Sequence, residues 1–115
     1  MAAGVYNFII EQGATLNKVI TWKDGYDAAI NLTGYTAVAQ FRPTITASPV
    51  LTLSSVTTGI TLGGVAGTIT LQATATTTTA LAAGEGVWEL ELTSSGGVVT
   101  RLLTGAYIIV PEVVR

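Results

Sequence analysis

Strict alternation of apolar and acidic side chains in the run Trp88–Leu92 constrains the fold more than any other feature of the chain. Such period-two alternation is the pattern of a β-strand that buries one face and exposes the other. A second run rich in β-branched residues and leucine, Val98–Thr104, follows after a Ser-Ser-Gly-Gly segment. Because glycine pairs between alternating runs are typical of hairpins, residues 86–104 are predicted to form a β-hairpin.

The loop of this hairpin predicts its register. Gly97 is expected in the left-handed conformation at the end of a three-residue loop. Counting back from that loop places Glu91 opposite Arg101. The same count places Leu90 opposite Leu102 and turns the apolar residues of the first strand inward.

The rest of the chain repeats this pattern in short runs bounded by turn residues. The runs expected to form strands are residues 5–10, 15–22, 35–41, 50–54, 60–62, 68–71, 86–93, 98–104 and 106–110. Short strands with turn signals every 8–12 residues predict an all-β fold, an antiparallel β-sandwich of about 7–9 strands. A single domain is expected to span residues 1–115.

Two irregularities are expected within this sandwich. The alternation in residues 15–22 slips once near Lys18-Val19, which predicts a β-bulge. A short helical turn is expected near residues 74–81, although the four consecutive threonines Thr76–Thr79 have low helix propensity.

Composition narrows the functional classes. Charged residues make up only 10% of the chain, against about 25% in a typical globular protein. So few charges are typical of a surface that other proteins cover. The net charge of −2 and the sequence pI near 4.8 argue against nucleic acid or an anionic membrane as the partner. The chain has no cysteine. It also has no histidine, which is the commonest general base and the commonest metal ligand.

Targeting segments are not predicted either. No apolar run approaches the ~20 residues that a membrane-spanning helix needs. The first residues, Met1–Gly4, have neither a basic region nor a continuous apolar stretch, so we expect no signal peptide.

Three motifs resemble chemical sites, and each is better explained as structure. The glycine-rich Gly63–Gly67 precedes a strand rather than a helix that begins with Lys-Ser or Lys-Thr, so it is interpreted as a turn and not a phosphate loop. Glu89 and Glu91 share one strand face, but their alternation with apolar residues explains them as the exposed side rather than a glycosidase pair. Asp24 and Asp27 lack the other ligand positions of a calcium loop and indicate a turn. We therefore expect no enzymatic activity, no catalytic residue, no metal and no cofactor.

The aromatic residues divide into candidates for the core and candidates for interfaces. Four are in phase with aliphatic neighbours and are expected in the core: Trp22, Tyr35, Phe41 and Trp88. Strands near the two termini are candidates for sheet edges, where apolar side chains can meet a partner protein. The residues predicted to form protein–protein interfaces are Tyr6, Phe8, Tyr107, Ile109, Pro111, Val113 and Arg115.

An ordered set of short motifs resembles a known group of proteins. The motifs are Tyr6-Asn7-Phe8, Glu11–Thr15, Trp22-Lys23-Asp24, Leu32–Tyr35, Phe41-Arg42-Pro43, Gly59–Leu71, Trp88–Thr93, Val98–Gly105 and Pro111–Arg115. Together they cover nearly the whole chain and resemble small virion proteins of tailed bacteriophages. The likeness is to the immunoglobulin-like N-terminal domain of baseplate upper proteins and tail-fibre adaptors. The tract Thr74–Thr79 departs from it, since a more polar, acidic helical turn would be expected there.

This resemblance implies an immunoglobulin-like sandwich that acts as a non-enzymatic structural subunit of the phage tail. It would lie at the baseplate or at a tail-fibre attachment point, after synthesis in the host cytoplasm. Its partners would be other baseplate or fibre subunits in a symmetric multi-copy assembly, without nucleic acid and without membrane insertion. Since no receptor-binding region follows Arg115, host recognition is expected to come from a partner chain. Two alternatives remain: a capsid decoration or cement protein, and a carbohydrate-binding module that contacts host glycan through exposed aromatic residues.

Overall fold

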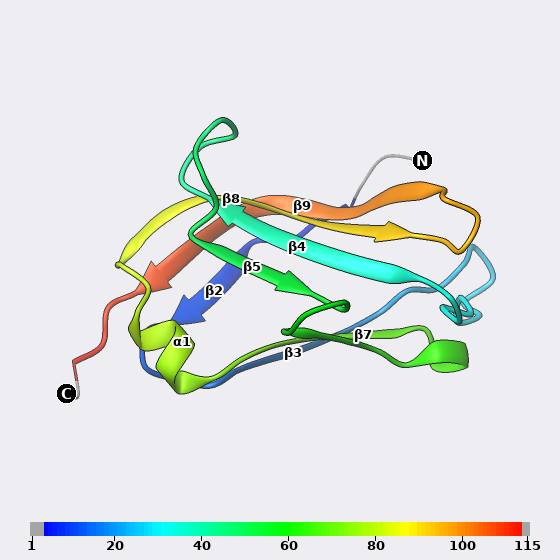
Figure 1. Ribbon diagram of the computed structural model, residues 1–115, viewed down its shortest axis with the longest axis horizontal. Helices are drawn as coiled ribbons and strands as arrows, with labels where there is room; N and C mark the ends of the chain where they lie inside the picture. The colour runs from blue at the N-terminus through cyan, green and yellow to red at the C-terminus, as the bar shows by residue number, and fades with distance from the viewer. Residues whose placement is uncertain (1–3, 114–115) are drawn as a thin grey trace.

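The computed structural model describes residues 4–113 and shows two β-sheets that form a sandwich (Figure 1). The larger sheet contains β1 (Gly4–Val5), β2 (Phe8–Glu11), β4 (Thr36–Arg42), β5 (Leu51–Ser54), β8 (Gly84–Thr93) and β9 (Val99–Val110). The smaller sheet contains β3 (Leu16–Thr21), β6 (Ile60–Leu62) and β7 (Thr68–Ala73). Two short helical segments lie in the connections, η1 (Gly64–Ala66) and α1 (Ala75–Thr79). The predicted all-β sandwich is confirmed.

The strand order follows the immunoglobulin pattern. The larger sheet runs β9–β8–β4–β5, with β1 and β2 beside β9, and the smaller sheet runs β3–β7–β6. An immunoglobulin sandwich pairs a G-F-C-C′ sheet with a sheet that contains B, E and D, and these strands occupy those positions in chain order. One expectation is corrected, because β1 and β2 pair with β9 in parallel and the larger sheet is therefore mixed. Alternation in a sequence reveals which face a residue takes, and not the direction of the neighbouring strand.

A close backbone contact divides the N-terminal strand into β1 and β2. The indole N–H of Trp88 donates a hydrogen bond to the carbonyl oxygen of Tyr6 at 2.7 Å. Gly105 lies against the same carbonyl, and a Cβ at that position would overlap it. The side chain of Asn7 accepts a hydrogen bond from a β9 backbone amide at 3.2 Å. The run predicted as one strand is therefore two, joined by a kink that faces β9.

Aromatic side chains form the centre of the core. Phe41 and Trp88 are cross-strand neighbours in β4 and β8, and their rings stack with centroids 5.5 Å apart. Phe8 lies edge-on to both rings, at 5.3 and 5.0 Å. Tyr107 lies edge-on to Phe41 at 5.5 Å. The remaining two aromatics expected in the core are half-buried at its margin and pack on each other: Trp22 and Tyr35.

The C-terminal hairpin has the predicted loop. Gly97 has a φ of 88° in the connection between β8 and β9, as a left-handed loop residue should. Glu91 lies opposite Arg101, so this part of the predicted register is confirmed. The strand that follows is longer than expected, because the runs predicted separately as 98–104 and 106–110 form one continuous β9.

A β-bulge in β9 overturns the other half of the predicted register. Leu90 pairs with Leu103, and Leu102 is the extra residue between Leu103 and Arg101. If β9 continued through Leu102 in regular register, the inward phase of buried Tyr107 would turn Arg101 into the sandwich. The bulge reverses the phase and keeps the guanidinium in solvent, since burying an unpaired charge is costly.

Strand β3, where a bulge was predicted, is regular. Its six residues pair with β7 without a break in register, so that prediction is wrong. Lys18 takes the inward phase, and Val19 is 56% exposed on the outer face. The ammonium of Lys18 lies 4.7 Å from the centroid of the Tyr6 ring, at the side of the sandwich. A lysine at an inward position is tolerated because its aliphatic stem can follow apolar surface to such an acceptor.

The helical turn predicted near residues 74–81 is confirmed as α1. The hydroxyl of Thr74 caps it by accepting a hydrogen bond from the Thr77 amide at 3.2 Å. Thr78 is fully buried, and its hydroxyl accepts from the Gly13 amide at 3.1 Å and donates to the Ala14 carbonyl at 2.8 Å. Helix α1 is thereby attached to the β2–β3 turn, which compensates for the poor helix propensity of threonine.

Candidate functional site

The predicted interface residues on β2 and β9 are mostly core residues. Phe8 is 2% exposed, and Tyr107 and Ile109 are each 3% exposed. Two facts explain the correction: β9 lies between β2 and β8 rather than at an edge, and these residues take the inward phase. Their side chains have almost no surface to offer a partner, so these three are no longer interface candidates.

The other predicted interface residues are distributed differently. Tyr6 is half-buried beneath the Lys18 ammonium, whereas Pro111 and Val113 are exposed after the end of β9. Arg115 lies outside the described residues.

An apolar patch occurs one residue away from the predicted positions, on the outer face of the larger sheet. It consists of Ile9, Val87, Ile108 and Val110, which we call the β2–β9 patch and which are 62, 37, 43 and 39% exposed. Ile9 and Ile108 are direct cross-strand neighbours. The pairing partners of the patch also include two carboxylates, since Glu11 pairs with Val110 and Glu85 pairs with Ile108. The patch is therefore an apolar surface with acidic side chains at its border.

Sequence reasoning missed this patch because both segments are apolar on both faces. In Phe8-Ile9-Ile10 and in Tyr107-Ile108-Ile109, alternation does not distinguish the buried face from the exposed face. Unbroken apolar runs in a small sandwich could have served as the signal, because they imply that one apolar face is left outside.

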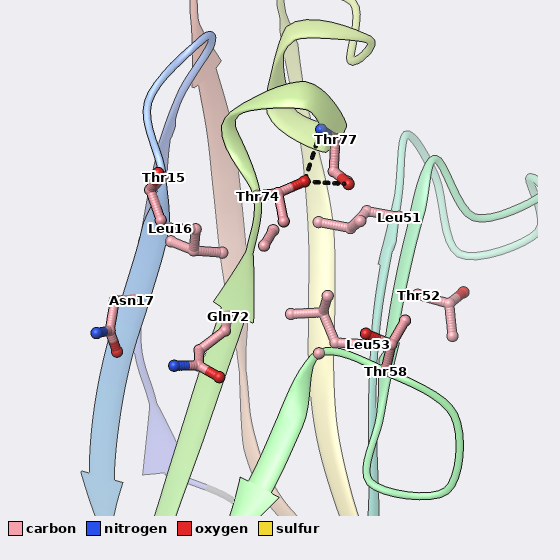
Figure 2. A pocket seen from close by; sticks show the side chains of 12 residues that line it. Thr15, Leu16, Asn17, Leu51, Thr52, Leu53, Thr58, Gln72, Thr74 and Thr77 are labelled. Atoms are coloured by element: carbon pink, nitrogen blue, oxygen red, sulfur yellow. Dashed lines mark hydrogen bonds between the residues drawn. The ribbon is translucent and has the colours of Figure 1, made fainter.

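A cleft with a volume of about 390 Å³ lies between the two sheets beside α1 (Figure 2). Its apolar lining comes from Leu16, Leu51, Leu53 and Ala73. Its polar lining is uncharged and comes from Thr15, Asn17, Thr52, Thr58, Gln72, Thr74 and Thr77. Figure 2 shows Leu51 and Leu53 pointing into the space beside β7, with Thr74 and Thr77 at one end. Hydroxyl and amide groups of this kind can donate hydrogen bonds to a bound group and accept hydrogen bonds from it.

The motifs that resembled chemical sites have structural roles. Glu89 is bound to Arg101 with 3.1 Å between Oε1 and Nε, and both side chains are largely exposed. The side chain of Asp24 accepts hydrogen bonds from the amides of Tyr26 and Ala28 at 2.8 and 3.1 Å. These bonds close a turn, so the carboxylate has a structural role rather than that of a cation ligand. The Gly63–Gly67 segment forms η1 and leads into β7.

No protein-family model matches the sequence, and no curated protein matches it significantly. Residues 4–113 contain no group of three or more histidine, cysteine or acidic side chains that could hold a metal ion. Over the same residues, no helix is long and apolar enough to cross a membrane.

Proposed function

We propose that the protein is a non-enzymatic structural subunit of a tailed-bacteriophage virion, at the tail baseplate or a tail-fibre attachment point. The motif order described above suggests this setting, and the β2–β9 patch is the observation that supports a role in assembly. Four neighbouring large apolar side chains on one sheet face are typical of a surface that another protein covers.

The proposed mechanism is burial of this patch against neighbouring subunits. Removing apolar surface from water contributes about 25 cal/mol for each Å². Few charges oppose it, because only 12 of the 115 residues are charged and burying an unpaired charge is costly. Repeated in many copies around a symmetric particle, modest interfaces add up to a stable assembly.

Electron microscopy of purified phage particles carrying a label on this subunit tests the proposal. A baseplate or fibre role predicts density in a three-fold or six-fold arrangement around the tail axis. Ile108→Asp should reduce incorporation strongly, because it places a carboxylate in the patch beside Glu85. Val65→Asp is the matched control, since Val65 is 73% exposed on the distant β6–β7 hairpin. Particles without the subunit, or equal incorporation of both variants, would contradict the proposed role.

The two alternatives give different outcomes in the same material. A cement protein would cover the capsid with a copy number on the order of hundreds. A carbohydrate-binding module would bind host polysaccharide as the purified chain. Tyr107 cannot serve that binding because it is buried, whereas Tyr26 is 94% exposed. Loss of glycan binding on Tyr26→Ala would therefore favour the carbohydrate alternative.

A further inference from the structure

The smaller sheet has a free edge along β3. In an immunoglobulin sandwich, strand A usually lies beside strand B, which is β3 in this protein. Here the N-terminal strands β1 and β2 both pair with β9 in the other sheet. Within residues 4–113, β3 pairs only with β7 and is the first strand in the order of the smaller sheet.

The backbone groups at this edge can be assigned from the register. The amide of Trp22 donates to the Gly67 carbonyl at 2.9 Å, one step beyond the β3–β7 ladder. Because bonded and non-bonded pairs alternate in an antiparallel ladder, the intervening residues point away from β7. Asn17, Val19 and Thr21 therefore direct their N–H and C=O groups toward the free edge.

Strand β3 carries one of the usual devices that protect an edge strand, the inward-facing Lys18, and lacks the others. It has six residues, an unbroken register and no proline, and the Lys18 ammonium lies over the Tyr6 ring. The other edges are shorter or interrupted. Strand β6 has three residues, and β5 has four, the last of which bonds back to Thr58. The N-terminal edge is broken by the kink between β1 and β2.

We propose that β3 pairs with β3 of a second copy, antiparallel about a two-fold axis at Val19. This inference rests on the proposed assembly role and names one of its contacts. In this register, Val19 faces Val19 of the second copy and Asn17 faces Thr21, so apolar meets apolar and polar meets polar. Lys18 faces Ile20, which keeps the two ammonium groups from facing each other. The backbone groups of Asn17, Val19 and Thr21 face the second copy. They form three hydrogen-bonded residue pairs across the axis, with two hydrogen bonds in each pair and up to about six in all.

The self-complementary sequence around Val19 is what favours a second copy over an unrelated strand. A two-fold interface requires each residue to suit its symmetry mate, and this edge satisfies that condition on its outer face, where Asn17 meets Thr21 and Val19 meets Val19. The two smaller sheets then become one continuous sheet, as in other cases of strand addition.

The absence of cysteine from the chain allows a direct crosslinking test. Val19→Cys places two thiols on residues whose Cα atoms are ~5.5 Å apart in a bonded antiparallel pair, within disulfide range. Mild oxidation of the purified full chain should give mostly covalent dimer. Val56→Cys, at a position that is 74% exposed in the β5–β6 connection, is the control and should remain largely monomeric. Equal crosslinking of the two variants would overturn the proposal.

Sedimentation of lysine variants provides a second measurement that does not depend on oxidation. The apparent mass of the unmodified chain should rise with protein concentration, from the monomer mass of 11.8 kDa toward twice that value. Val19→Lys should weaken association about tenfold or more, because two ammonium groups face each other across the axis. Gln72→Lys adds the same charge to the same sheet face on the central strand β7 and should leave association within about twofold of the unmodified chain.

The two proposals can fail separately. A chain that stays monomeric at all concentrations, yet is found in phage particles, would refute β3 pairing and leave the assembly role in place. A chain that dimerises through Val19 but is absent from particles would refute the virion role and leave the pairing in place.

Discussion

The buried hydroxyl of Thr78 is the most informative single group to remove. It connects α1 to the β2–β3 turn through the Gly13 amide at 3.1 Å and the Ala14 carbonyl at 2.8 Å. Thr78→Val keeps the volume and the β-branched shape of the side chain while deleting the hydroxyl. The amide of Gly13 and the carbonyl of Ala14 would then face a methyl group.

The expected cost follows from these two groups. A buried polar group left without its partner costs about 1–3 kcal/mol. Both partners lie in a half-buried turn, where water can compensate in part, so the lower half of that range applies to each. The variant should lose about 2–4 kcal/mol of unfolding free energy, the sum over the two groups. With an unfolding entropy of about 0.24 kcal/mol per kelvin for 115 residues, that loss lowers Tm by about 8–17 °C.

Urea and thermal unfolding, followed by circular dichroism, provide the measurement. Thr79→Val is the matched control, because Thr79 lies in the same helix and is exposed. It should change stability by no more than about 0.5 kcal/mol. Thr78→Ser keeps the hydroxyl and should lose only about 1 kcal/mol for the missing methyl group. Equal stability of Thr78→Val and Thr79→Val would refute the reasoning that hydrogen bonds, rather than packing alone, hold α1 in place.

Three further predictions concern the larger sheet. Gly105→Ala should destabilise the fold by about 1–3 kcal/mol in urea unfolding, since its Cβ overlaps the Tyr6 carbonyl, whereas Gly96→Ala in the hairpin loop meets nothing closer than 3.9 Å and should be tolerated. Burial raises the pKa of Tyr107 above its usual value of 10.0, so the unfolded chain releases this proton first. The contribution of neutral Tyr107 to the free energy of unfolding is complete below pH ~10 and is lost as the pH rises through the pKa of Tyr107 in the folded chain. Tyr107→Phe should therefore flatten the alkaline decline in unfolding free energy. An unchanged slope would contradict the attribution of this decline to Tyr107. Arg101→Gln should change the unfolding free energy by less than about 1 kcal/mol, because its 3.1 Å pair with Glu89 is exposed, and a larger loss would show that the bulge depends on that pair.

Sequence patterns predicted elements best where one face is polar. The alternation in Trp88–Leu92 and in β4 identified the buried residues correctly, and the glycine at position 97 predicted its loop. Patterns failed where a charge is placed by tertiary contacts. The phase slip near Lys18-Val19 predicts a bulge, whereas β3 is regular and Lys18 faces inward, because its ammonium contacts Tyr6 in the kink between β1 and β2.

The candidate surfaces were harder to predict than the fold. The strands near the termini were predicted to be edges, but β9 is interior, and the exposed residues of these strands are Ile9, Ile108 and Val110 rather than their neighbours. Which side of an apolar strand faces the core depends on the phase set by its partners, and the sequence of that strand does not carry this information.

By itself, the sequence determined that this chain forms a charge-poor β-sandwich with a short helical turn, because local alternation and turn chemistry are properties of neighbouring residues. Only the tertiary structure decided where strands end, which edges are free and which apolar face remains outside. Those features depend on pairing between segments such as β2 and β9, whose register residues are about a hundred positions apart in the chain. The bulge at Leu102 belongs to this second class, since it reconciles the buried phase of Tyr107 with the solvated charge of Arg101.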